Sequence, residues 1–213
     1  MDNNIRWVNK KKIEKTIDAL NKNGMCGYLV EGRDELIQKI KDLVPKGSLV
    51  GCGGSASLLE MKVIDFIREY DYEFLDRYES GLSKEELKNL HRKSFFADAY
   101  FTSTNAITQN GELYNVDGNG NRVAAMLYGP DKVIVVCGVN KIVKNIEEAI
   151  TRNEQISAPA NTKRLNTKTP CKETGYCMDC SSMDRICCEY TVIKKQRTLN
   201  RIHVIFINEN LGY

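Results

Sequence analysis

Short apolar runs alternate with amphipathic segments along most of this chain, and this alternation is the feature that most restricts its fold. Apolar residues recur at three- and four-residue spacing in the helix-like segments, whereas the strand-like runs are short and rich in β-branched residues. Helices are predicted at residues 4–23, 34–44, 58–70, 84–96, 121–129 and 140–156, and strands at 26–30, 48–52, 72–75, 132–138 and 201–207. Strands that alternate with helices are typical of an α/β fold, a layered Rossmann-like arrangement around a largely parallel sheet.

Two segments depart from this alternation. Residues 97–118 are predicted to form two strands, a turn at Asn110-Gly111 and a third strand, which is a hairpin pattern. Because a hairpin is antiparallel, we expect the sheet to be mixed. Residues 157–200 are polar and contain two prolines and many of the cysteines. We interpret 157–200 as a Cys-rich excursion before the closing strand, within a single α/β domain that spans residues 1–213.

The charge balance restricts the class of partner. The chain has 31 Lys and Arg against 28 Asp and Glu, for a net charge of +3. That excess is too small to predict binding to nucleic acid or to an anionic membrane surface. No apolar run approaches the roughly 18–20 residues that a membrane-spanning helix needs. The first residues, MDNNIRWVNKKK, lack the apolar core of a signal peptide, so we expect a cytoplasmic protein.

A glycine-rich loop, GCGGSAS at residues 51–57, joins a predicted strand to a predicted helix. Gly53 and Gly54 let the backbone approach a ligand, and the helix N-terminus offers N–H groups to an anion. The hydroxyls of Ser55 and Ser57 add further donors. The loop matches neither a dinucleotide fingerprint nor a phosphate-binding loop with its lysine. The alternative is a tight turn in which Ser55 is only the helix N-cap.

A second loop, DGNGNR at residues 117–122, also opens a predicted helix. Arg122 could hold a carboxylate or phosphate through its forked N–H groups, with Asn121 beside it. The alternative is a glycine-rich turn in which Asn121 caps the helix and Arg122 is solvated. If both loops bind ligand, Gly53, Gly54, Ser55, Ser57, Asn121 and Arg122 converge on one anion site.

The chain has eight cysteines, and they fall into two groups. Cys26, Cys52 and Cys137 lie in apolar runs and are expected to be buried thiols. The others are crowded together near the C-terminus, at Cys171, Cys177, Cys180, Cys187 and Cys188. Crowded cysteines in a cytosolic chain favour a metal over disulfides, and four thiolates suit zinc or an iron–sulfur cluster. We expect Cys171, Cys177, Cys180 and Cys187 as ligands and Cys188 outside; free thiols or labile disulfides are the alternative.

Several motifs, in order, resemble a known family. The stretches GGSASL, STNAIT, NGEL, VDGNGNRVA, VIVVCGVNKIV and PCKETGYCMDC are similar to those of LUD-domain lactate-utilisation proteins, which include the C component of the bacterial L-lactate utilisation operon. The resemblance spans about residues 4–213. It implies a fold similar to the superfamily of ribose-5-phosphate isomerase, glucosamine-6-phosphate deaminase and CoA transferases.

The resemblance also implies a function in the oxidation of lactate to pyruvate. Members of that superfamily bind phosphate or CoA at glycine-rich loops like GGSAS, so a small carboxylate or phosphate is the expected ligand. Sister subunits of a lactate-oxidation system are the implied partners, and a homodimer is left open. The link to electron transfer favours an iron–sulfur cluster over zinc. A stand-alone enzyme similar to sugar-phosphate isomerases is the alternative, although Asp117 is the only acidic residue within a loop motif.

Overall fold

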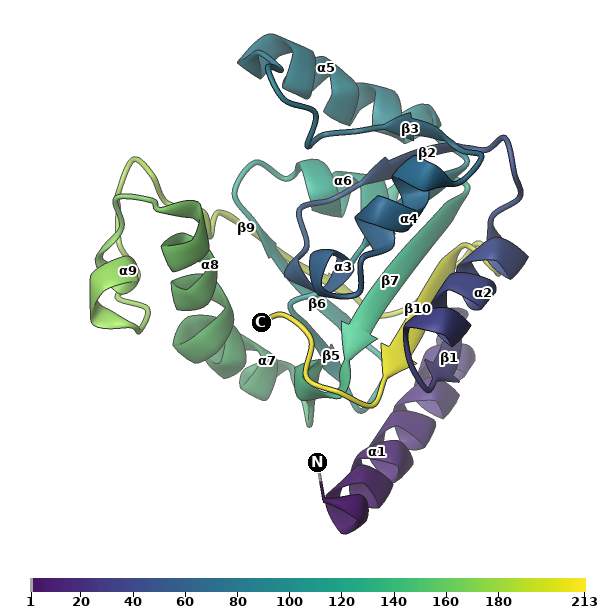
Figure 1. Cartoon of the computed structure of the whole chain (residues 1–213). Coiled ribbons are helices and arrows are strands. Elements are labelled where there is room, and N and C mark those ends of the chain that lie inside the picture. The colour runs from purple at the N-terminus through teal and green to yellow at the C-terminus, as the bar shows by residue number, and fades with distance from the viewer. Residues whose placement is uncertain (1) are drawn as a thin grey trace.

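The centre of the molecule is a fully parallel six-stranded sheet, seen in a computed structural model that describes residues 2–213 (Figure 1). The strand order is β1-β10-β7-β4-β2-β3, and all neighbours are parallel. These strands are β1 (Cys26–Val30), β2 (Leu49–Cys52), β3 (Glu73–Leu75), β4 (Ala99–Thr102), β7 (Lys132–Gly138) and β10 (Ile202–Ile207). Parallel strands brought together by crossover helices confirm the α/β prediction.

One face of the sheet is covered by α2 (Arg33–Leu43), α3 (Ala56–Glu60) and α4 (Val63–Glu69). Ile40 and Ile64 of these helices are buried in the same apolar cluster as Ile134 of β7. The apolar face that helical spacing predicts for residues 34–44 therefore packs on the sheet. The predicted helix at 58–70 is interrupted at Lys62, which has a left-handed backbone (φ 52°), and so forms the two short helices α3 and α4.

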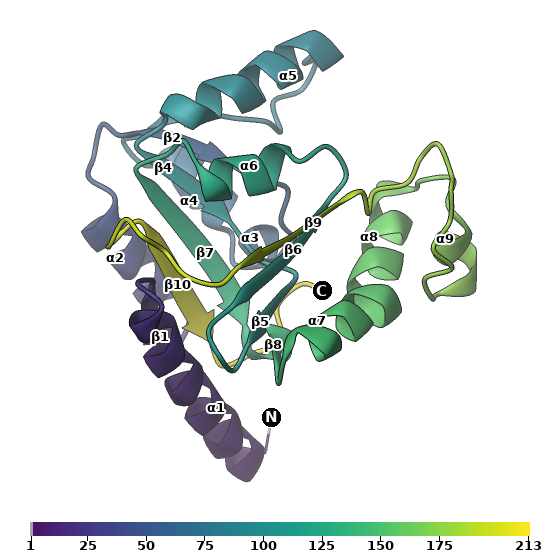
Figure 2. The same cartoon turned by 180° about the vertical axis from the view of Figure 1, so that it is seen from behind.

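The other face is covered by α1 (Asn3–Lys22), α6 (Asn121–Leu127) and a second, smaller sheet (Figure 2). Strand β7 serves both faces, because successive side chains of a strand point in opposite directions. Val133 and Val135 pack with Ile13 of α1, whereas Ile134 and Val136 pack with the helices of the opposite face. The central sheet thus has an apolar cluster on each of its two faces.

The second sheet contains the predicted hairpin. Its order is β8-β5-β6-β9, with β8 (Ile142–Val143), β5 (Ala106–Thr108), β6 (Leu113–Asp117) and β9 (Glu189–Ile193). The antiparallel pairs β5–β6 and β6–β9 are confined to this sheet. The expectation of one mixed sheet is therefore wrong, because the chain leaves the central sheet after β4 and the hairpin pairs elsewhere. The range 157–200 includes β9, which pairs with β6 before the chain reaches β10.

The remaining helices lie outside the central layers. Helix α5 (Lys84–Lys93) begins after a capping box formed by Ser83 and Glu86 and continues as a 3-10 turn, Ser94–Phe96. Two segments form the C-terminal helical region: α7 (Ile146–Arg152), which continues as a π-turn into α8 (Ala158–Leu165), and the short α9 (Pro170–Thr174). None of the helices within residues 2–213 is long and apolar enough to cross a membrane.

The predicted helix at 140–156 begins later than expected. Its first residues form a 3-10 turn, Val139–Lys141, and the strand β8, and the helix starts only after the N-cap Asn145. The Asn145 side chain accepts a hydrogen bond from the Glu148 N–H. An Asn followed three residues later by Glu is a helix-start signal, and apolar spacing alone overlooked it.

The hairpin turn packs closely on α1, and this contact yields a test of the layer arrangement. Gly111 has φ +76°, and a Cβ there would lie 2.7 Å from the backbone of Ala19 and Leu20. Gly111→Ala is expected to lower the free energy of unfolding by about 3 kcal/mol, since it adds a backbone clash to the cost of a left-handed alanine. Gly47→Ala is the control, because Gly47 has φ +77° and open space around it. Its expected cost is about 1 kcal/mol. Equal losses of unfolding free energy in the two variants, measured by urea denaturation, would contradict the close contact at Gly111.

Candidate functional site

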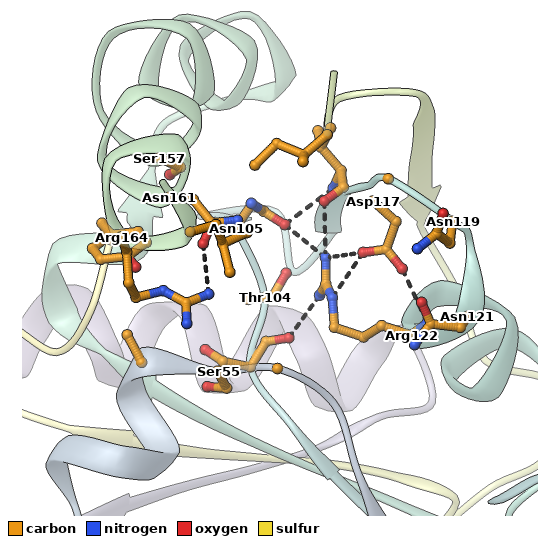
Figure 3. A pocket seen from close by; sticks show the side chains of 18 of the residues that line it. Ser55, Thr104, Asn105, Asp117, Asn119, Asn121, Arg122, Ser157, Asn161 and Arg164 are labelled. Atoms are coloured by element: carbon orange, nitrogen blue, oxygen red, sulfur yellow. Dashed lines mark hydrogen bonds and ion pairs between the residues drawn. The ribbon is translucent and has the colours of Figure 1, made fainter. Parts of the chain in front are cut away.

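A cavity of about 230 Å³ lies where several strands of the central sheet reach their carboxyl ends. Most of its walls come from the β2–α3 loop, the β4–β5 loop, the β6–α6 loop and α8. In Figure 3, Asn161 and Arg164 of α8 lie on one side, and Asp117, Asn121 and Arg122 lie on the other. Ligands of parallel α/β sheets bind at this edge, where loops and helix N-termini converge. The two glycine-rich loops singled out in the sequence therefore meet at one cavity.

The β2–α3 loop caps a helix and also borders the cavity. Ser55 is the N-cap of α3, since its Oγ accepts a hydrogen bond from the Leu58 N–H at 3.2 Å. Gly54 and Ser55 also line the cavity. Gly53 is buried beneath it, where a Cβ would lie 3.1 Å from the Arg122 side chain. Ser57 does not line the cavity, and its hydroxyl lies against the wall residue Lys141.

Each nitrogen of the Arg122 guanidinium donates hydrogen bonds to acceptors of the protein. Its Nε and Nη2 contact Asp117 Oδ1 at 2.8 and 2.7 Å and form a largely buried ion pair. Its other N–H groups donate to the carbonyls of Ser103 and Val116 and to the side-chain oxygens of Asn105 and Asn115. Since every guanidinium nitrogen has a protein acceptor, Arg122 acts here as a support for the loops. That it also binds the anion stays a prediction.

Asp117 closes the start of α6. Its Oδ2 accepts hydrogen bonds from the backbone N–H groups of Arg122 and Val123, both at 3.0 Å. The N-cap position is Gly120, in a left-handed conformation, and Asn121 is the first helical residue. The alternative of Asn121 as N-cap is therefore wrong. Two N–H groups expected to face an anion are already occupied by Asp117.

Two other arginines supply the accessible positive charge. Arg77 and Arg164 both line the cavity. Arg164 Nη2 donates to Asn161 Oδ1 at 2.7 Å, and Arg77 lies over the ring of Tyr78. Within residues 2–213, neither arginine has a carboxylate within ion-pair distance. Both guanidinium groups therefore retain N–H donors for a ligand.

Lys141 lines the same cavity from the end of β7 and is almost fully buried, with 3% of its surface exposed. Its Nζ donates to Ser57 Oγ and Ser103 Oγ, each at 3.0 Å. Burial lowers the pKa of Lys141 to about 8, because the charged ammonium loses its hydration. The nearby Cys137 thiol opposes this shift, whereas Arg152 and Arg122 add to it.

The four expected cysteine ligands surround a second, much smaller cavity of about 20 Å³ beside α8. Cys171, Cys177, Cys180 and Cys187 line it, and Cys188 does not. The Asp179 N–H donates to Cys177 Sγ at 3.4 Å. Burial, followed by the neighbouring thiols, raises the pKa of Cys187 to about 11. The cavity thus brings together the cysteines that the spacing selected.

These thiols do not form a ready coordination sphere. Across residues 2–213, no group of three or more His, Cys, Asp or Glu side chains is arranged to hold a metal ion. The donor types fit zinc or iron, and a cavity of this size has room for about one small ion. A bound metal would therefore require the thiols to move closer together.

Sequence reasoning missed much of the cavity. Ser103 follows β4, and Lys141 follows β7, so both stand at the carboxyl edge where ligands bind. The strand pattern could have found Ser103. Lys141 was hidden by the helix predicted over residues 140–156. Arg77 and Arg164 lie in segments with no motif, and only the three-dimensional structure brings them to the cavity.

Comparisons with known proteins agree with this fold. A family model described as the LUD domain matches residues 13–207. A solved structure of a DUF162 family protein from Deinococcus radiodurans is similar with a TM-score of 0.52 and 15% identity, over 93% of this chain and 98% of that chain. At that identity the likeness shows the fold alone. The structure of eIF2B beta from Chaetomium thermophilum has a TM-score of 0.36 and 17% identity, over 53% of this chain and 43% of that chain. Comparison with curated proteins gave no match.

The lowered pKa of Lys141 predicts a specific pH dependence of stability. Between the folded pKa of about 8 and the ordinary 10.5, the unfolded chain keeps the proton that the folded chain has lost. The contribution of this residue to the free energy of unfolding therefore rises with pH across that window. Relative to Lys141→Met, the wild-type chain should gain stability in urea denaturation between about pH 7 and about pH 9.5. Tyrosines and cysteines titrate in both proteins and cancel. A constant difference would show that the pKa is not lowered.

Proposed function

Because the chain belongs to the LUD-domain family, which is associated with lactate utilisation, we propose that it is a small-anion-binding component of an L-lactate oxidation system. Its ligand would be a small carboxylate, of which lactate and pyruvate are the first candidates. The supporting observation is the charge of the cavity. Sister subunits that carry out the electron transfer would be its partners.

The cavity holds positive charge that no protein carboxylate neutralises. The only acidic side chain in its lining is Asp117, which is paired with Arg122. Arg77, Arg164 and Lys141 remain, and hydrogen-bond donors surround them. A carboxylate can accept two parallel N–H bonds from one arginine. A small anion in this cavity would therefore have its charge balanced and would be held in one orientation.

The cavity volume favours a small ligand. About 230 Å³ is below the roughly 300–1,000 Å³ typical of sites for drug-sized molecules. The polar lining comes from hydroxyls and amides, including Ser55, Thr104, Asn105 and Asn161. Groups of this kind suit the oxygen atoms of a hydroxy acid or an oxo acid.

The sugar-phosphate isomerase alternative has less support. Isomerisation needs a free base beside the bound substrate. Asp117 is engaged by the Arg122 guanidinium and by two backbone N–H groups. Both of its oxygens already accept hydrogen bonds from the protein, so Asp117 is not the free base that this reaction needs.

Anion binding is tested by thermal denaturation. Lactate or pyruvate at saturating concentration should raise the melting temperature by several degrees, since each kcal/mol of binding energy raises it by roughly 2–4 °C in a chain of this size. Arg164→Gln and Arg77→Gln should each lose most of that shift. Arg33→Gln, at an exposed arginine at the start of α2, is the matched control and should keep it. Inorganic phosphate and a sugar phosphate are the comparison ligands.

Two results would contradict the proposal. One is an unchanged melting curve with every small carboxylate. The other is an equal loss of the shift in all three arginine variants, which would indicate unspecific ionic stabilisation. A shift with sugar phosphates only would support the isomerase alternative.

We also propose that Cys171, Cys177, Cys180 and Cys187 bind one metal centre. The support is their convergence on a single cavity with Cys188 outside it. The cavity of about 20 Å³ fits a single ion such as zinc better than a cluster of several iron atoms. Arg185 already ties this segment together, since it donates to the carbonyls of Cys180 and Cys187. Metal binding would stabilise the ordered form of this polar segment, which gains little from apolar burial.

Metal content after anaerobic purification tests this site. About one equivalent of zinc is expected, and Cys180→Ser should lower it to near zero because three thiolates hold zinc less tightly. Cys188→Ser is the matched control, since Cys188 is adjacent in sequence and outside the cavity, and it should retain the metal. Iron with inorganic sulfide would identify a cluster instead. Less than about a tenth of an equivalent of either metal would contradict the site.

A further inference from the structure

Lys141 is buried without the charged partner that a purely structural lysine usually has. It follows the longest strand of the central sheet, and its amine reaches the floor of the cavity. Its printed hydrogen bonds are both to hydroxyls, at Ser57 and Ser103. A lysine that only stabilises a fold usually has a carboxylate partner when it is buried this deeply. Within residues 2–213, no carboxylate lies at ion-pair distance from Lys141.

The surroundings of Lys141 increase the neutral fraction of its amine. Burial disfavours the charged ammonium, and the cations Arg152 and Arg122 act in the same direction. The opposing groups are the Cys137 thiol, which is itself buried and holds its proton, and the carboxylate of Glu60 at the surface. A neutral amine has a free electron pair, which makes it a nucleophile.

We propose that the Lys141 amine forms a reversible imine with a 2-oxo acid, such as pyruvate, held in this cavity. This inference rests on the proposed function, because the arginines at the cavity wall would hold the carboxylate. It goes further because it gives Lys141, a residue of the cavity lining, a covalent function. The ligand class is then a 2-oxo acid, whose carbonyl carbon is adjacent to the carboxylate.

The step balances without an added reactant. The Lys141 nitrogen donates its electron pair to the carbonyl carbon, and one of its protons passes to the carbonyl oxygen to give a carbinolamine. The second nitrogen proton passes to the hydroxyl, which leaves as water, and a neutral C=N bond remains. Nothing is oxidised or reduced. Hydrolysis by the same water reverses the step, so the ligand is released unchanged.

Ser103 is positioned to move the proton. Its hydroxyl lines the cavity and lies 3.0 Å from the Lys141 Nζ and 3.5 Å from Ser57 Oγ. Ser57 in turn donates to the Leu211 carbonyl. The Ser103 hydroxyl can therefore give a proton to the carbonyl oxygen and recover one from the amine. Its backbone is fixed, because the Ser103 carbonyl accepts a bond from Arg122.

Lactate and pyruvate carry the same charge but differ in their ability to form an imine. Lactate and pyruvate both offer a carboxylate to the arginines, but only pyruvate has a carbonyl carbon that an amine can attack. Lactate is therefore a competitor that occupies the cavity and blocks imine formation. A purely structural Lys141 would show no such difference.

Reductive trapping of the full chain tests this. The protein is incubated with pyruvate and cyanoborohydride, which reduces an imine to a stable secondary amine, and tryptic peptides are examined by mass spectrometry. Lys141 should carry the adduct at least about tenfold more often than any exposed lysine, because its neutral fraction at pH 7 is far larger. An excess of lactate should suppress labelling at Lys141 and leave exposed lysines such as Lys62 unchanged.

Lys141→Arg is the matched variant, since arginine keeps the charge but stays protonated and forms no imine. It should lose the adduct. The peptide map of the wild-type chain decides the matter even if this variant fails to fold. A pyruvate-dependent thermal shift without an adduct at Lys141 would overturn the imine and leave anion binding intact. Absence of both shift and adduct would overturn both proposals, and equal labelling of exposed lysines would overturn the imine alone.

Discussion

The buried ion pair between Asp117 and Arg122 is the interaction on which the cavity depends. Arg122 joins the β4–β5 loop to β6, and Asp117 closes the start of α6, so three segments are fixed by one pair of side chains. A buried charge that loses its partner costs about 3–5 kcal/mol, so neither residue is dispensable. The sequence motif DGNGNR is therefore explained by the architecture of the wall. The glycines let the chain turn back so that Arg122 meets Asp117 five residues earlier.

The α/β layering was predictable from periodicity alone, and so was the meeting of two glycine-rich loops at the carboxyl edge of the sheet. Those features depend on local spacing and on the geometry of parallel strands. The separate second sheet was not predictable, because strand pairing depends on where the chain goes after Thr102 rather than on any local signal. Lys141 was missed for a different reason. Apolar residues at Ile142 and Val143 fit helical spacing, but they pack as a short strand beside β5.

Helix α8 connects the two cavities. Asn161 and Arg164 face the larger cavity, whereas Ala158 and Thr162 line the one between the cysteines. Ile186, from the cysteine segment, lines both. Ordering of the thiols by a metal would therefore also fix a wall of the larger cavity. This gives the Cys-rich segment a physical reason to lie beside the sheet edge instead of extending into solvent, since its loop and α8 share one packing surface.

Six of the cations differ in what their N–H donors already hold. Arg152 and Arg201 are buried and Arg122 is largely buried. All three donate to carbonyls or side chains, and Arg201 binds the carbonyls at the end of α6. Such arginines take the place of water for backbone oxygens. Arg77, Arg164 and Lys141 differ because their surroundings leave the charge or the amine facing the cavity. Residue type alone could not separate the groups: Arg122 stands in a glycine-rich motif, whereas Arg164 stands in none. The number of acceptors that the fold places around a cation decides how many of its N–H donors are left for a ligand.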